Sequence, residues 1–170
     1  MTYEQRKQIK VIVSSLIKIL KIDCPVNLDK LVSTLGGKID YNIIDNCADG
    51  MVTKNSNGEF VISLSENQSS ERRRFTIAHE LGHLFLHMGF PNDDWNPKKK
   101  IFFRYGYSEL EYQANEFAAC LLMPEKIFID IVNTNLDKSG NVNVINVARY
   151  FEVSESAVIN RGKWLGVFEW

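Results

Sequence analysis

Residues 75–87 read FTIAHELGHLFLH, and the pattern H-E-x-x-H at their centre decides the fold. The apolar residues around this pattern predict a largely buried helix. On a helix, His79 and His83 share one face about 6 Å apart along the axis, so both imidazoles can bind one cation. Glu80 lies beside the pair and can accept a proton from a water molecule held there. The stretch therefore predicts a metal site built for hydrolysis.

The third histidine of the chain, His87, continues the same spacing. It lies about 12 Å from His79 along a straight helix, which is too far for one ion with bonds of about 2 Å. We therefore expect His87 to contact a metal ligand or to be structural, not to bind the metal itself. The third ligand must come from elsewhere, and a carboxylate is the natural choice because many zinc hydrolases use a His₂Glu set.

A second helix is predicted over residues 108–124, SELEYQANEFAACLLMP, from apolar residues at helical spacing. Of its glutamates, Glu111 lies roughly 75° from the centre of the apolar stripe, whereas Glu109 and Glu116 lie roughly 125° and 145° away. Only Glu111 borders the buried face, so we predict it as the third ligand and expect the other two to be solvated. Asn115, one turn further on, could hydrogen-bond to Glu111 or to a ligand imidazole.

The amino-acid composition limits the classes of protein to which this chain can belong. A chain of 170 residues, 45% of them hydrophobic, can form one good core. A net charge of -1 and a pI near 6.3 argue against binding to nucleic acid or membranes as the main activity. The cysteines (Cys24, Cys47 and Cys120) are scattered and odd in number, which fits reduced thiols. No signal peptide or long apolar run is evident, so we expect a cytoplasmic protein.

The remaining patterns predict an α+β, zincin-like fold over residues 1–170. Its core, at about 25–135, should contain a small, mostly antiparallel sheet packed on helices that include the metal-binding helix. A helical tail should follow at 141–170. Helices are expected over 3–21, from Asn27 to Leu35, and from Ser69 or Ser70 onward; strands are expected over 39–44, 51–53 and 60–64, the last two joined by a turn at 55–58.

For three other segments we prefer a purely structural interpretation over a functional one. The tail contains AxxFxVSxxAVxxR at 148–161, which looks superficially like a helix-turn-helix, but its basic residues are balanced by acidic ones. We expect these helices to pack on the core. The run Arg72-Arg73-Arg74 should be solvated or should pair with carboxylates. Segment 89–107 is expected to connect the two metal-binding helices on the surface, with a lid as the equal alternative.

The segments FTIAHELGHLFLH and ExxANEFAACLLMP, in this order, resemble the ImmA/IrrE family of metallopeptidases. The resemblance covers roughly residues 25–130. It implies a gluzincin-type protein in which His79, His83 and Glu111 bind the metal and Glu80 is the catalytic carboxylate. Members of this family are associated with mobile elements or stress responses and with cleavage of helix-turn-helix repressors. We expect this chain to be of the short mobile-element type, without the long sensory C-terminal domain of the stress-response members.

Three functions are compatible with these residues. The first is a zinc endopeptidase that cuts a helix-turn-helix repressor and so derepresses genes, with an edge strand near residues 49–64 aligning the substrate. The second is a non-catalytic, metal-containing regulator that binds DNA or a repressor through its C-terminal helices. The third is a hydrolase of a non-peptide amide. A His₂Glu set favours zinc over manganese or iron. We expect a protein substrate, no membrane partner and no direct nucleic-acid binding.

Overall fold

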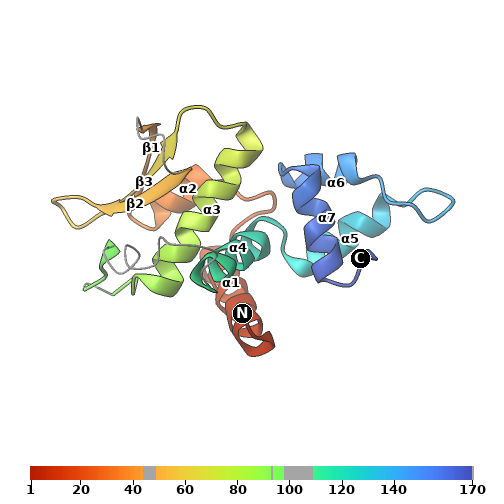
Figure 1. Cartoon of the computed structure of the whole chain (residues 1–170), viewed down its shortest axis with the longest axis horizontal. Coiled ribbons are helices and arrows are strands. Elements are labelled where there is room, and N and C mark those ends of the chain that lie inside the picture. Colours follow the sequence, from red (N-terminus) through yellow and green to blue (C-terminus); the bar gives the residue numbers. More distant parts are fainter. Residues whose placement is uncertain (44–48, 93, 98–108, 170) are drawn as a thin grey trace.

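The computed structural model describes residues 1–43, 49–92, 94–97 and 109–169 and shows an α+β architecture (Figure 1). The predicted fold class is confirmed, and each expected helix and strand is present within about two residues of its expected bounds. In chain order the elements are α1 (Tyr3–Leu20), α2 (Leu28–Thr34), β1 (Lys38–Ile43), β2 (Gly50–Lys54), β3 (Phe60–Ser65), α3 (Ser70–His87), α4 (Glu109–Leu122), α5 (Glu125–Thr134), α6 (Val144–Phe151) and α7 (Glu155–Trp164).

The three strands form a mixed sheet in the order β1-β3-β2. β2 pairs antiparallel with β3 through the predicted hairpin, whereas β1 pairs parallel with β3. A mostly antiparallel sheet was expected, so one of the two pairings differs from the prediction. The hairpin has a local turn signal at 55–58, with Gly58 at φ +84°. The direction of β1 has no such local signal, because its partner strand lies far along the chain.

The sheet buries one face against α3. β3 alternates between buried and half-buried residues, with Phe60, Ile62 and Leu64 on the buried side. Both β2 and β3 contact α3, which in turn contacts α4 (Figure 1). The metal-binding helix therefore lies between the sheet and the helix that carries the predicted third ligand.

α3 and α4 approach closely at one glycine. A Cβ atom placed on Gly82 would lie 3.0 Å from both the Cα and the carbonyl oxygen of Ala114, and 3.1 Å from Cβ of Phe117. Gly82 and Ala114 are both buried. The absence of a side chain at Gly82 thus lets the two backbones come into contact.

The start of α3 is held by hydrogen bonds and ion pairs. The Ser69 side chain accepts a hydrogen bond from the backbone N–H of Arg72, which identifies Ser69 as the N-cap. Arg72 pairs with Asp49, Arg73 donates to a backbone carbonyl, and Arg74 pairs with Glu152. The basic run therefore serves as a set of partners for nearby groups, as expected.

The tail packs on the core, as expected. Val147, Phe151 and Val158 belong to the same buried cluster as the residues of α3 and α4. A left-handed residue, Glu152 at φ 55°, turns the chain between α6 and α7, and Ser154 caps α7. None of the helices in the described part of the chain has the length and hydrophobicity to cross a membrane.

The position of Glu116 differs from the prediction. It was expected on a solvated face, but only 10% of its side chain is exposed. Its Oε1 lies 3.3 Å from Nη1 of Arg161 on α7, and its Oε2 lies 3.6 Å from Nε of Arg6 on α1. A helical wheel assumes one buried face, whereas α4 is covered by α3 on one side and by α1 and α7 on others. Arg161 also donates to the Met123 carbonyl at 3.2 Å, so it anchors the tail to α4.

We predict that Arg161→Met destabilises the protein by about 3 kcal/mol, because it leaves the Glu116 carboxylate buried with less compensation. Arg149→Met is the matched control, since Arg149 lies on the exposed side of α6. Urea unfolding measures both. Equal stabilities of the two variants would show that the Arg161 anchor contributes nothing.

Candidate metal centre

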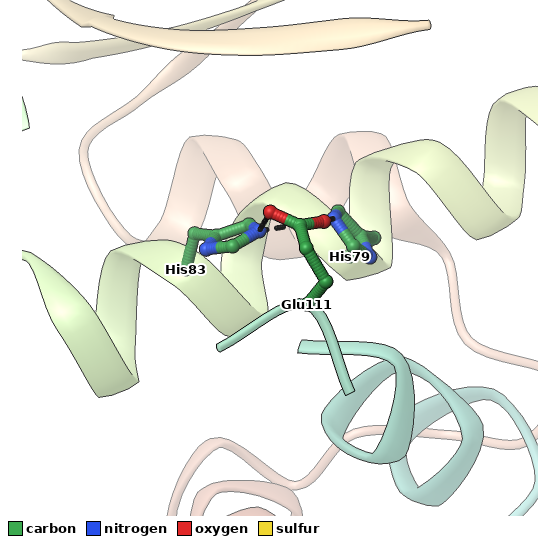
Figure 2. Close-up of side chains that lie close together, drawn as sticks. All are labelled: His79, His83 and Glu111. Atoms are coloured by element: carbon green, nitrogen blue, oxygen red, sulfur yellow. Dashed lines mark hydrogen bonds and ion pairs between the residues drawn. The ribbon is translucent and has the colours of Figure 1, made fainter. Parts of the chain in front are cut away.

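His79, His83 and Glu111 come together between α3 and α4 (Figure 2). Their candidate ligand atoms all lie within 4.8 Å of one another. The Nε2 atoms of the two histidines are 3.0 Å apart. Oε2 of Glu111 lies 3.1 Å from Nε2 of His79, and its Oε1 lies 3.3 Å from Nε2 of His83. The structure thus places the three residues that the sequence singled out in one group, which we call the metal group.

The spacing of these atoms fits a zinc ion. A tetrahedral ion with bonds of about 2.0–2.1 Å holds its ligand atoms roughly 3.3–3.4 Å from each other. The two imidazole nitrogens are 3.0 Å apart, and each lies 3.1 or 3.3 Å from a different oxygen of the Glu111 carboxylate. Small outward shifts of the side chains would therefore admit the ion. Nitrogen and carboxylate oxygen are also donors that zinc accepts, and the group could hold other divalent transition metals.

The group is buried on one side and open on the other. The His83 side chain is 1% exposed and that of His79 15%, whereas 40% of the Glu111 side chain is exposed. Structural zinc sites are closed by four protein ligands, and catalytic sites keep one position open. Three ligands with an exposed side correspond to the second arrangement.

The outer nitrogens of both histidines have partners. Nδ1 of His79 lies 2.8 Å from Oδ1 of Asn115 on α4. Nδ1 of His83 lies 2.9 Å from Nδ1 of His87, one turn further along α3. The two residues expected near the ligands, Asn115 and His87, are therefore placed in contact with them, Asn115 on an imidazole and not on Glu111. Such contacts orient the rings so that the Nε2 atoms face the group.

Glu80 is buried next to the edge strand. Its exposed fraction is 3%, and it lies on α3 between the two histidines in sequence. A Cβ atom placed on Gly50 would lie 3.5 Å from Oε1 of Glu80 and 2.4 Å from Cγ2 of Thr76. The first residue of β2 thus fits against Thr76, and beside Glu80, only because it lacks a side chain. The sequence analysis gave no role to Gly50, which lies outside the motifs, or to Thr76, which lies within residues 75–87 but meets β2 only in the folded chain.

The two cysteines in the described part of the chain are not activated nucleophiles. Burial raises the pKa of both Cys24 and Cys120 to about 11, so both remain neutral thiols near pH 7. Cys47 lies outside the described residues. A cavity of about 750 Å³ lies elsewhere, between the first turn of α3 and the tail helices, with Arg74 and Arg149 among its lining residues. It includes no member of the metal group.

We predict that Glu111→Gln weakens zinc binding by at least about 100-fold, because an amide is a poor ligand for zinc. Competition with a chromogenic chelator measures the affinity. Glu109→Gln is the control, since Glu109 starts the same helix and is largely exposed. Zinc binding that is equally strong in the two variants would remove Glu111 from the ligand set.

Comparisons with known proteins agree with this geometry. The family model Peptidase_M78, described as the IrrE N-terminal-like domain, matches residues 49–163, about two thirds of the chain. No curated protein matches the sequence. A solved structure named Mycobacterium tuberculosis transcriptional regulator is similar at a TM-score of 0.61 and 16% identity, covering 95% of this chain and 48% of that one. The chain thus spans about half the length of that protein, and at this identity the likeness shows the fold alone. From the family match, the chain belongs to the ImmA/IrrE family of metallopeptidases.

Proposed function

We propose that the protein is a zinc-dependent endopeptidase that acts on a helix-turn-helix repressor in the cytoplasm. The observation that carries the proposal is an open His79–His83–Glu111 group with the Glu80 carboxylate buried beside it. Membership of the ImmA/IrrE family supports peptide-bond hydrolysis. A metal with a purely structural role would need neither the open side nor an adjacent proton acceptor.

A divalent ion, when bound, supplies a water molecule of lowered pKa and polarises the scissile carbonyl. Glu80 accepts the proton of that water and transfers it to the leaving amine nitrogen. Burial of Glu80 keeps bulk water away from the carboxylate and holds it in one place. Asn115 and His87 fix the ring orientations of His79 and His83, so the ligand atoms are in position before the substrate arrives.

The edge strand β2 is the element best placed to align a substrate. It is one of the two edge strands of the β1-β3-β2 sheet, and its first residue, Gly50, lies beside Glu80. An extended peptide that added to this edge would run past Glu80 and the metal group. Main-chain hydrogen bonds would provide affinity without sequence preference, so the choice of substrate would come from other contacts.

The negative oxygen of the transition state needs a hydrogen-bond donor beside the metal group. Arg161 is engaged by Glu116 and Met123 and is therefore less suited to this role. Tyr112 follows Glu111 in sequence and is half exposed, which makes it a candidate on the open side. Of the other tyrosines, Tyr150 lies on α6; Tyr105 and Tyr107 lie outside the described residues.

The choice of a repressor as substrate comes from the resemblance to ImmA/IrrE proteins. The similar solved structure is named a transcriptional regulator, which places that protein, too, in gene control. A cytoplasmic repressor is also within reach of a cytoplasmic peptidase. The resemblance further suggests a mobile genetic element as the source of both proteins.

The alternative is a non-catalytic regulator that binds DNA or a repressor through α6 and α7. Arg161 of α7 is buried against α4, and Glu155 lies in the first turn of the same helix. Both features reduce the attraction of this surface for phosphate. Binding to duplex DNA at low salt, with a steep salt dependence, would favour the alternative. A non-peptide amide substrate would use the same residues and is distinguished by substrate assays.

We predict that Glu80→Gln lowers the rate of repressor cleavage by about 100-fold or more, because the amide cannot accept the proton. Zinc affinity should change little. The assay uses the repressor encoded beside this gene and follows its fragments by mass spectrometry. Glu71→Gln, in the first turn of α3, is the control. Undiminished cleavage by the zinc-loaded Glu80→Gln protein would rule out this function for Glu80.

We also predict that Gly50→Ala lowers the cleavage rate while zinc affinity stays within about threefold, because the new methyl group would collide with Cγ2 of Thr76 and push β2 away from α3, and so from Glu80, without touching a ligand. Gly58→Ala in the hairpin turn is the control for strain at a glycine of the same sheet, since its Cβ would meet only a lysine side chain. If Gly50→Ala cleaves as fast as the wild type, the position of β2 against Glu80 is not required.

A further inference from the structure

A chain of polar contacts continues from the metal group across α3 to α4. Nδ1 of His83 lies 2.9 Å from Nδ1 of His87, and Nε2 of His87 lies 3.0 Å from Oε1 of Gln113. His83 is almost completely buried, so water cannot replace its contact with His87, whereas His87 and Gln113 are half-buried. Gln113 lies two residues after Glu111 on α4, and it contacts His87.

The contact between the two Nδ1 atoms restricts where the protons can be. A neutral imidazole carries one N–H, so one ring must donate and the other must accept. If His83 donates, the proton of His87 is on Nε2, and Nε2 of His83 presents a lone pair toward Nε2 of His79 at 3.0 Å and Oε1 of Glu111 at 3.3 Å, an arrangement of facing acceptors that a bound cation would stabilise. If His87 donates, the proton of His83 is on Nε2, inside the group. Only the first arrangement lets Nε2 of His83 bind a cation.

We propose that Gln113 is a positioning residue that selects this first arrangement. Its amide oxygen accepts a hydrogen bond from Nε2–H of His87. That bond leaves Nδ1 of His87 as an acceptor for Nδ1–H of His83, so the lone pair of His83 points at the metal. This role deepens the proposed function and rests on it. Asn115 has the corresponding role for His79 and acts directly, because its Oδ1 accepts a hydrogen bond from Nδ1–H of His79.

The positions of Gln113, Ala114 and Asn115 explain how one helix, α4, contacts both His79 and His87. Ala114 lies on Gly82, and Gln113 and Asn115 lie to either side of it in sequence. α3 crosses α4 at this contact. His79, three residues before Gly82, therefore meets Asn115, whereas His87, five residues after it, meets Gln113. A helical wheel puts Gln113 about 200° from Glu111, so no sequence pattern would have selected it.

The test compares three side chains at position 113. Met has nearly the shape of Gln but no acceptor, and Glu can only accept. Zinc affinity is measured by chelator competition, and the protonated nitrogen of His83 is identified by ¹⁵N NMR of the zinc-free protein at about pH 8, above the usual imidazole pKa of about 6.5. Gln8→Met, on the exposed face of α1, is the control.

We expect Gln113→Met to weaken zinc binding by about 10–100-fold and to remove the preference of His83 for Nδ1–H. Gln113→Glu should keep that preference and bind zinc at least as tightly as the wild type. Both variants are also made in a His87→Leu background. There, Gln113→Met should have no further effect, and Gln113→Glu should report only the effect of its added charge.

Two results would overturn the role of Gln113. One is wild-type zinc affinity and an unchanged His83 tautomer in Gln113→Met. The other is an equal loss of affinity with and without His87, which would mean that Gln113 does not act through that residue. If the wild type binds no zinc but the tautomer still changes in Gln113→Met, the proposed function fails and the proton-ordering role of Gln113 stands.

Discussion

The contact of Gly82 with the backbone of Ala114 is the constraint on which the metal group depends. It sets the distance between α3 and α4, and the group is built from residues of both helices. The two histidines and His87 come from α3, whereas the carboxylate and the side chains that contact His79 and His87, Asn115 and Gln113, come from α4. A side chain at Gly82 would separate all of these pairs at once, because they lie on both sides of the same crossing.

Local periodicity was enough to predict much of the fold and the metal group. His79 and His83 share a helix face by spacing alone, and Glu111 borders the apolar stripe of its own helix. Features that depend on a second element were not predictable in this way. Glu116 is buried because α1 and α7 cover a face that a wheel assigns to solvent, and the parallel direction of β1 depends on a distant strand. Gly50 and Gln113 contribute through contacts with residues that lie far away in sequence.

The metal group and Glu80 combine two environments that metal-assisted hydrolysis would require. His83 and Glu80 are buried, where hydrogen bonds and fixed geometry persist, and Glu111 is on the exposed side, where a substrate would enter. The tail contributes to this arrangement from a distance. Arg161 binds the Glu116 carboxylate and the Met123 carbonyl, so α7 helps to hold the helix that carries Glu111. The use of Arg161 inside the structure also leaves the tail with less positive charge for nucleic acid.

X-ray absorption spectroscopy of the zinc-loaded protein tests the central claim most directly, because it reports the ligands without depending on a substrate. The account predicts two imidazole nitrogens and one carboxylate oxygen at about 2.0–2.1 Å, with a further light atom completing the coordination. The imidazole scattering should fall by half when His83 is replaced by alanine. A sulfur ligand at about 2.3 Å, or a spectrum without imidazole scattering, would contradict the assignment of the metal to this group.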